Sequence, residues 1–176
     1  VTAEVEELKS IVSIDEAMKS KSFLDEPMIV STGDSKKAIK NAKNTLTGSL
    51  SIGGQEHYYL EGQVAMSIPT EDNEMVVHSS TQNPTEVQHL VAHVLNVPQN
   101  AIEVITRRMG GGFGGKETDS SQLACICAIF SEKTKKPVKA RLSRKDDMLL
   151  TGKRHDFVAN YEVGYSDDGL IQGIDM

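Results

Sequence analysis

Residues 102–117 read IEVITRRMGGGFGGKE, and this stretch decides the fold class of the chain. Its apolar start, Ile102 to Thr106, predicts a strand, and the part from Arg107 to Lys116 predicts a loop. The run from Asp119 to Glu132 then predicts a helix. A strand that passes through a loop into a helix is typical of a domain that combines sheet and helix layers.

Further strands and helices are predicted on both sides of this stretch. Apolar patterning predicts strands at residues 45–52, 63–68, 74–79, 137–142 and 157–164, and short helices at residues 13–20 and 35–42. In the first of these strands the apolar residues all fall on one side, which leaves the other side for solvent. Together the elements predict an α+β (α/β) fold with mixed sheets and helices.

A longer helix is predicted to begin at the sequence Asn83-Pro-Thr-Glu86. Asn83 is the expected cap, and Glu86 is the residue that reaches back to it. Five apolar residues follow at helical spacing and are expected to face a core: Val87, Leu90, Val91, Val94 and Leu95. Asn96 and Pro98 are expected to end the helix.

The composition is that of a globular protein of about one domain. Of the 176 residues, 38% are hydrophobic and 25% are charged, which is enough to form a core without disulfide or metal staples. The 19 basic and 25 acidic residues give a net charge of −6, which argues against a nucleic-acid partner. No apolar stretch approaches the roughly 20 residues that cross a bilayer, so no membrane association is expected.

The cysteines and the first residue bear on location and completeness. Cys125 and Cys127 lie in an apolar run and are expected to be small buried residues in a reducing cytoplasm. The chain starts at Val1 without an initiator methionine or a signal peptide. It is therefore interpreted as a fragment of a longer polypeptide.

The glycine-rich loop fits two nucleotide-binding patterns incompletely. Gly110 to Lys116 matches G-x-x-x-x-G-K, but Glu117 follows instead of the serine or threonine that a P-loop needs for magnesium. The loop also fits G-x-G-x-x-G, but the next predicted strand ends near Arg144 without the acidic residue that holds a ribose. ATP and NAD are therefore disfavoured, and Arg144 leaves NADP as the remaining nucleotide alternative.

A different role for the loop follows from its glycine content. Five glycines in the six residues Gly110–Gly115 let the backbone approach a bulky ligand and present N–H groups to an anionic or oxo-bearing group. A flexible surface linker would not need Phe113 at its centre or Glu117 at its rim. The loop is therefore predicted to bind a ligand.

The histidines are interpreted as structural or solvated residues. His89 and His93 are four residues apart on the predicted helix, as two ligands of one zinc ion would be. No third ligand stands out, and their face is turned away from the apolar one, so both are expected to be solvated. His57 and His155 are expected to be structural.

Four ordered segments resemble the xanthine dehydrogenase and aldehyde oxidase family of molybdenum hydroxylases. These segments are Gly53–Glu61 (GGQEHYYLE), Ser79–Asn83 (SSTQN), Met109–Glu117 (MGGGFGGKE) and Asp147–His155 (DMLLTGKRH). The resemblance is greatest to the large, molybdopterin-binding subunit of the bacterial xanthine dehydrogenase type. It implies the fold of the family's molybdenum-cofactor-binding domain. Residues 1–44 would be a connector from a preceding domain, and residues 45–176 the first part of the molybdopterin-binding domain, truncated at both ends.

The resemblance also implies roles for individual residues. Gln82 would hydrogen-bond an oxo or hydroxo ligand of the metal. The backbone N–H groups of Gly112, Phe113 and Gly114 would hold the molybdenum end of the cofactor. Glu117 would hydrogen-bond a purine, and because family members that act on aldehydes usually lack an acid here, it favours xanthine as substrate.

The implied reaction is oxidative hydroxylation of purines, from hypoxanthine to xanthine to urate. Electrons would pass through 2Fe–2S and FAD centres, on other domains or subunits, to NAD. The chain is expected to contain no catalytic residue, because the family's general base would lie beyond Met176. By itself it is expected to be inactive and to bind no cofactor, and the parent is expected to be a cytoplasmic oligomer. The alternatives are an aldehyde oxidase-like or other molybdenum hydroxylase, and a non-catalytic binding or assembly module of the same fold.

Overall fold

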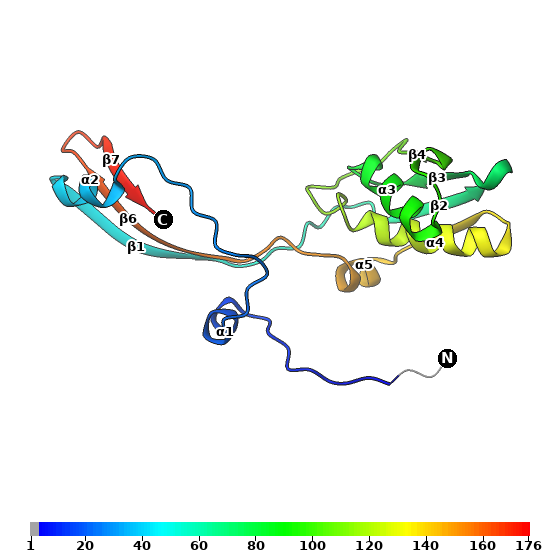
Figure 1. Cartoon of the computed structure of the whole chain (residues 1–176), viewed down its shortest axis with the longest axis horizontal. Helices are drawn as coiled ribbons and strands as arrows, with labels where there is room; N and C mark the ends of the chain where they lie inside the picture. The colour runs from blue at the N-terminus through cyan, green and yellow to red at the C-terminus, as the bar shows by residue number, and fades with distance from the viewer. Residues whose placement is uncertain (1–3) are drawn as a thin grey trace. The chain divides into compact units, whose positions relative to one another are not determined.

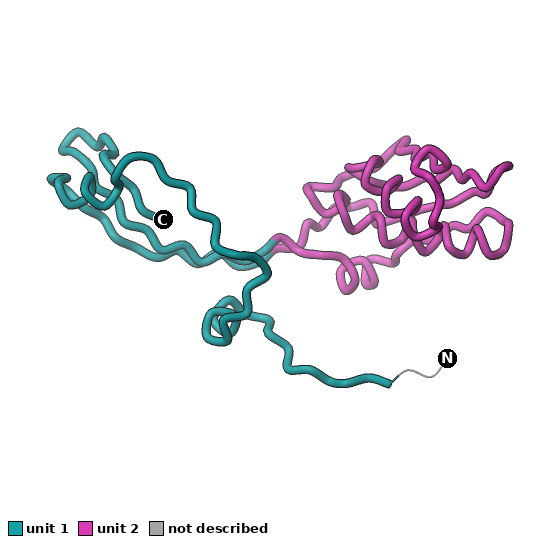
Figure 2. Tube along the Cα trace, in the orientation of Figure 1, with its two compact units in different colours: residues 1–54, 155–176 teal, residues 55–154 magenta. Residues whose placement is uncertain are grey.

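The computed structural model describes residues 4–176, which form two compact units. One unit contains the chain up to Gly54 together with His155–Met176, and the other contains Gln55–Arg154 (Figure 2). Gln55 and Arg154 pair with each other, because each backbone N–H donates to the other's carbonyl, at 3.1 and 2.9 Å. The second unit is thus one continuous segment whose two ends meet.

The first unit is a three-stranded antiparallel sheet with a helix packed on it (Figure 1). Its strands are β1 (Asn44–Ile52), β6 (Phe157–Tyr165) and β7 (Ile171–Asp175), in the order β1-β6-β7. Helix α2 (Ser35–Asn41) packs on β6 and β7 and buries Ile39. Helix α1 (Ile14–Ser20) buries no side chain.

Both helices of the N-terminal stretch were predicted, and their caps explain where they begin. Ser13 Oγ accepts a hydrogen bond from the N–H of Glu16 at 3.2 Å, and Asp34 Oδ1 accepts one from Lys37 at 3.0 Å. Because α2 packs on the sheet of the first unit, the predicted boundary near residue 44 does not coincide with a unit boundary. That residues 1–44 lead from a preceding domain stays a prediction.

The second unit is a four-stranded mixed sheet, as predicted, with helices packed against it. The strands are β2 (Val64–Pro69), β3 (Met75–Ser79), β4 (Ile102–Ile105) and β5 (Val138–Arg141), in the order β4-β3-β2-β5. Only β3 and β4 run parallel. The helices are α3 (Pro84–Leu95), α4 (Ser120–Thr134) and α5 (Arg144–Leu150), with short 3-10 turns η1 (Glu71–Asn73) and η2 (Gln99–Ala101). Neither α5 nor β7 of the first unit was predicted from the sequence.

The core of the second unit lies where α3 and α4 meet the sheet. In β3, Met75 and Val77 are fully buried, as the alternation of a strand with one covered face requires. Val87 of α3 and Cys127 of α4 close the same cluster. Cys127 is therefore the buried residue that was predicted, and Cys125 is half-buried at the edge of the core.

Two predicted buried faces are wrong in part. On α3, Leu90 and Val94 remain 39% and 44% exposed, because α3 meets α4 and β4 along a narrower stripe than the helical spacing suggests. On β1, Leu46 and Leu50 are each 53% exposed, because α2 packs mainly on β6 and β7. In both cases the spacing is correct, but the neighbouring element covers less of the apolar face than expected.

Candidate functional site

The glycine-rich stretch is a loop between β4 and α4, as predicted. Phe113 and Gly114, at its tip, adopt left-handed backbone conformations with φ of +54° and +93°. A bulky residue such as Phe113 is strained in this region, so the surrounding contacts must hold it there. The loop therefore has a defined shape, which the following contacts explain.

Gln82 holds the second half of the loop. Its Oε1 accepts hydrogen bonds from the N–H groups of Gly114, at 3.0 Å, and Lys116, at 3.2 Å. A Cβ atom at Gly112 would lie only 2.4 Å from this Oε1, so glycine is required for the side-chain amide to lie against the loop. Because the amide oxygen accepts two N–H groups, the amide nitrogen Nε2 is the end that can donate to a ligand.

Glu61 holds the first half of the loop. Its Oε2 accepts a hydrogen bond from the N–H of Gly111 at 2.9 Å, and this bond holds the pKa of the Glu61 carboxyl below its usual range. Glu61 belongs to a segment that resembles the family, but its contact with the loop was not predicted. No local pattern reveals a contact that spans 50 residues of sequence.

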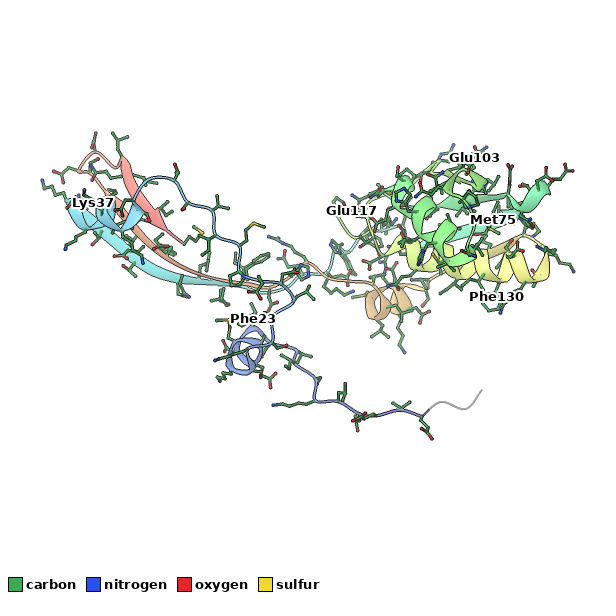
Figure 3. The ribbon with its side chains drawn as sticks, in the orientation of Figure 1. Phe23, Lys37, Met75, Glu103, Glu117 and Phe130 are labelled. Carbon is green, nitrogen blue, oxygen red and sulfur yellow. The ribbon has the colours of Figure 1, made fainter. Side chains whose placement is uncertain are left out.

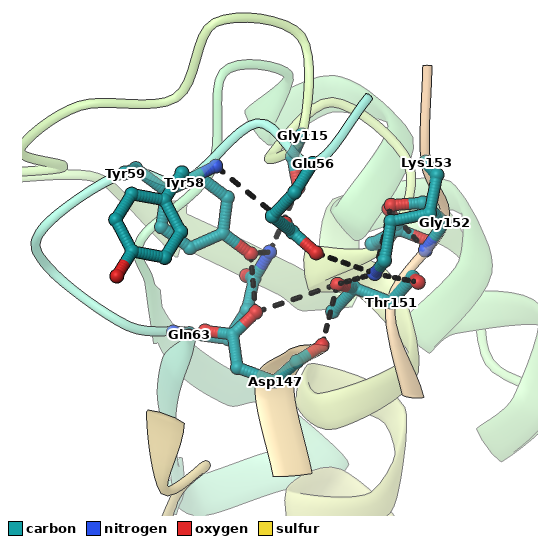
Figure 4. A network of polar contacts seen from close by, with 10 residues as sticks. Glu56, Tyr58, Tyr59, Gln63, Gly115, Asp147, Thr151, Gly152 and Lys153 are labelled. Atoms are coloured by element: carbon teal, nitrogen blue, oxygen red, sulfur yellow. Dashed lines mark hydrogen bonds and ion pairs between the residues drawn. The ribbon is translucent and has the colours of Figure 1, made fainter. Parts of the chain in front are cut away.

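A buried polar network supports the inner side of the loop (Figure 4). The Tyr59 hydroxyl donates to Oδ1 of Asp147 at 2.5 Å, and the backbone N–H of Gln63 donates to Oδ2 at 3.0 Å. Gln63 Nε2 then donates to the carbonyl of Gly115 at 2.9 Å. Burial, followed by the hydrogen bond to Asp147, raises the pKa of Tyr59 to about 12, so the phenol stays protonated.

Lys116 lies inside the unit beneath this loop, with an exposed fraction of 0%. Its Nζ donates to the carbonyl of Met109 at 2.7 Å and lies 4.6 Å from the centre of the Tyr59 ring. Burial lowers the pKa of Lys116, and the nearby carboxylate of Glu61 opposes this shift. A P-loop lysine must reach phosphate, whereas Lys116 points inward, which agrees with the rejection of an NTPase from the sequence.

The predicted site residues lie on or against the loop. Gln82, Gly112 and Gly114 are in contact, and Phe113, whose side chain is 76% exposed, lies at the tip. Glu117 is exposed at the end of the loop (Figure 3). Its carboxylate forms no ion pair within residues 4–176. The N–H of Gly114 donates to Oε1 of Gln82 at 3.0 Å. The roles of these residues toward a cofactor stay predictions.

Comparison of the sequence with known proteins shows the family of the chain. The sequence matches the molybdopterin cofactor-binding domain over residues 19–176. The chain belongs to this family. The chain is 43% identical over 176 residues to both the xanthine dehydrogenase of Dictyostelium discoideum and the probable aldehyde oxidase gad-3 of Caenorhabditis elegans. These matches cover 100% and 99% of the chain but span only 13% and 14% of the two relatives.

Solved structures show the same fold. The aldehyde oxidoreductase from Desulfovibrio desulfuricans ATCC 27774 superposes with a TM-score of 0.81 at 20% identity, over 97% of this chain and 20% of that one. Quinoline 2-oxidoreductase from Pseudomonas putida 86 superposes with a TM-score of 0.76 at 19% identity, over 96% and 22%. The predicted fold class, that of a molybdenum-cofactor-binding domain of the aldehyde oxidase and xanthine dehydrogenase type, is therefore confirmed.

The free hydrogen-bond donors of the loop fit such a cofactor. The N–H groups of Gly112 and Phe113 and the Nε2 of Gln82 donate to no acceptor within the described part of the chain. Donors fixed in this way suit oxo and other anionic groups. Residues 4–176 hold no cluster of three or more histidine, cysteine, aspartate or glutamate side chains arranged for a metal ion.

The structure places three of the predicted histidines as expected. His89 and His93 are exposed on α3, as expected for solvated side chains. The His57 ring packs against Gly115, because a Cβ atom at Gly115 would lie only 2.7 Å from this ring. His57 therefore supports the loop by packing. His155 is exposed and follows the second unit, and the structural role expected for it stays a prediction.

Each helix within residues 4–176 is too short or too polar to span a bilayer.

Proposed function

We propose that this chain forms part of the cofactor-binding portion of a xanthine dehydrogenase, which hydroxylates purines from hypoxanthine to xanthine to urate. The observation that carries the proposal is the free carboxylate of Glu117, at the end of a loop that Gln82 holds in place. The identity of 43% to a xanthine dehydrogenase over the whole chain supports it.

Gln82 and the loop would hold the cofactor. The Nε2 of Gln82 would donate to an oxo or hydroxo ligand of the metal, and the N–H groups of Gly112 and Phe113 would donate to neighbouring atoms of the cofactor. Since these donors are already held in position, they need no reorganisation during the reaction. When bound, the cofactor would supply the two-electron oxidation of the substrate.

Glu117 would recognise the purine. Its carboxylate would accept a charge-assisted hydrogen bond from a ring N–H or hydroxyl of the substrate. Such a bond strengthens when charge shifts within the ring during attack on carbon, so it would stabilise the transition state more than the bound substrate. Aldehydes without a heterocycle lack this partner.

The remaining machinery would lie in other domains or subunits, because the chain spans 13% and 14% of the two relatives. These parts would supply the general base, the 2Fe–2S and FAD centres, and the path of electrons to NAD. We also place the parent protein in the cytoplasm as an oligomer, in accord with the resemblance to xanthine dehydrogenase.

An aldehyde oxidase is the second candidate, because gad-3 is also 43% identical to the chain. The two functions differ in what they require of Glu117. In a purine hydroxylase the carboxylate would bind the ring of the substrate. A simple aldehyde has no ring N–H that the carboxylate could bind.

The test is to produce the full-length protein with its partner subunits and to measure molybdenum, pterin and urate formation from xanthine with NAD as acceptor. An aldehyde is assayed in parallel. We expect cofactor-loaded protein that forms urate. Loaded protein that oxidises only the aldehyde would support the second candidate, and inactive protein without metal would support a non-catalytic module.

A further inference from the structure

Lys116 is a buried cation to which the proposed function gives no role. Its side chain is 0% exposed, and no carboxylate within the described residues lies at ion-pair distance from it. An unpaired ammonium in such a place is costly to bury, and its protein partners are one carbonyl and one aromatic ring. Its position therefore calls for an explanation in terms of what these two partners hold.

The first partner closes the loop. Met109 and Lys116 bracket the glycine segment, and the Nζ to carbonyl hydrogen bond of 2.7 Å ties one end of it to the other. The backbone carbonyl of Lys116 accepts hydrogen bonds from the hydroxyls of Thr81 and Ser120, both at 3.2 Å. The residue thus joins both ends of the loop to the turn before α3 and to the first residue of α4.

The second partner, the ring of Tyr59, is held in a fixed position. The hydroxyl of Tyr59 is held by Asp147 and by Gln63 Nε2, at 2.5 and 3.0 Å. The backbone carbonyl of Tyr59 accepts a hydrogen bond of 2.6 Å from the guanidinium of Arg144. Because the ring is held from both ends, the ammonium above its face has one favourable position.

We propose that Lys116 is a positioning residue for the cofactor loop. Its ammonium, seated on the Tyr59 ring, ties Met109 to the far end of the loop. This tie keeps the free N–H groups of Gly112 and Phe113 in one arrangement. The nature of the ligand rests on the proposed function, but the effect of Lys116 on the loop does not.

The experiment compares Lys116→Met, Lys116→Arg and the control Lys139→Met in the full-length protein. Lys139 is an exposed lysine of β5 in the same unit. Hydrogen exchange is measured at the hydrogen-bonded loop amides of Gly111, Gly114 and Lys116, followed by molybdenum content. We expect Lys116→Met to speed loop exchange by roughly tenfold or more without changing exchange in β2 and β3, and to lower the molybdenum content. Lys116→Arg should restore both, since a guanidinium can donate to the same carbonyl and stack on the same ring.

Two results would overturn the proposal. One is normal loop exchange and normal molybdenum content in Lys116→Met, and the other is faster exchange throughout the second unit, which would make Lys116 a general structural residue. If Lys116→Met does not fold, Lys116→Gln replaces it, because glutamine keeps a polar side chain without the charge of the lysine. Lys116→Gln must show fast loop exchange, and slow exchange in this variant would reject the role.

The exchange measurement needs neither cofactor nor substrate. Wild-type protein that lacks molybdenum, with the expected exchange pattern among the variants, would reject the proposed function and leave the role of Lys116 intact. If the wild-type protein contains molybdenum and is active, but Lys116→Met leaves the loop exchange unchanged, the proposed function stands and the role of Lys116 is rejected.

Discussion

Gln82 and Lys116 bind each other in both directions. The backbone N–H of Gln82 donates to the carbonyl of Lys116 at 2.8 Å, and the backbone N–H of Lys116 donates to the side-chain Oε1 of Gln82 at 3.2 Å. The residue that would contact the metal ligand is thus fixed by the residue that ends the loop. A change at either of them is expected to be felt at the other.

Gln82→Ala should loosen the loop and lower cofactor content. The substitution removes the acceptor of two backbone N–H groups and the Nε2 donor together. We expect molybdenum per protein to fall severalfold, with a loss of about 1–3 kcal/mol in the free energy of unfolding. The measurements are metal analysis and urea denaturation, with Gln122→Ala on the exposed side of α4 as control. Full metal content in Gln82→Ala would contradict the role of this side chain.

Gly112→Ala should have a similar effect from the other side of the same contact. The added methyl group would lie 2.4 Å from Oε1 of Gln82 and must push the amide or the loop aside. We expect a destabilisation of about 1–3 kcal/mol and reduced cofactor content. Gly53→Ala is the matched control, because no atom lies within 4 Å of its Cβ position. Equal stability and equal cofactor content in the two variants would show that the close approach of Gln82 to Gly112 is unimportant.

Glu117→Ala should separate purine from aldehyde oxidation. Loss of a charge-assisted hydrogen bond of about 1.5–3 kcal/mol should reduce turnover on xanthine by about tenfold to a hundredfold. Turnover of a simple aldehyde and molybdenum content should be spared, because Gln82 and the loop remain. Steady-state rates on both substrates test this, with Glu103→Ala, an exposed glutamate of β4, as control. Equal losses on both substrates would remove Glu117 from substrate selection, and loss of metal would make it structural.

Tyr59→Phe should change how stability depends on alkaline pH. The pKa of Tyr59 is raised from 10.0 to about 12, so its protonated form stabilises the fold below pH 10, and this contribution is lost as pH rises toward 12. The shift corresponds to roughly 2–3 kcal/mol. The variant lacks this hydroxyl, so wild type should be more stable at neutral pH, and the difference should shrink above pH 10. Urea denaturation across this range tests the expectation, and a constant difference would contradict it.

The elements that local patterns describe were predictable from the sequence. The strand that ends before Thr106, the loop and helix α4 follow from apolar patterning and glycine content, and the caps of α2 and α3 follow from Asp34 and Asn83. These features depend on residues close in sequence. They could therefore be predicted without knowledge of the tertiary structure.

The support of the loop could not be predicted in this way. Asp147 looks like one of two adjacent acids in a polar stretch, yet it is 1% exposed and lies on α5, a helix too short for periodicity to reveal. Its hydrogen bond to Tyr59 spans 88 residues. Lys116 likewise looks like a solvent-exposed or phosphate-binding lysine. Only the tertiary structure shows that the aromatic ring and the carbonyl beneath the loop enclose it.

The pairing of Gln55 with Arg154 has a consequence for how such a protein can change during evolution. β1 and β6 pair as far as Ile52 and Phe157, immediately before the chain enters the second unit and after it leaves. A segment that enters and leaves at one point can be exchanged as a cassette while the flanking strands keep their register. The glycine loop and all its supports lie inside this cassette. Ligand preference can therefore diverge by replacement within residues 55–154, while the host sheet is inherited unchanged.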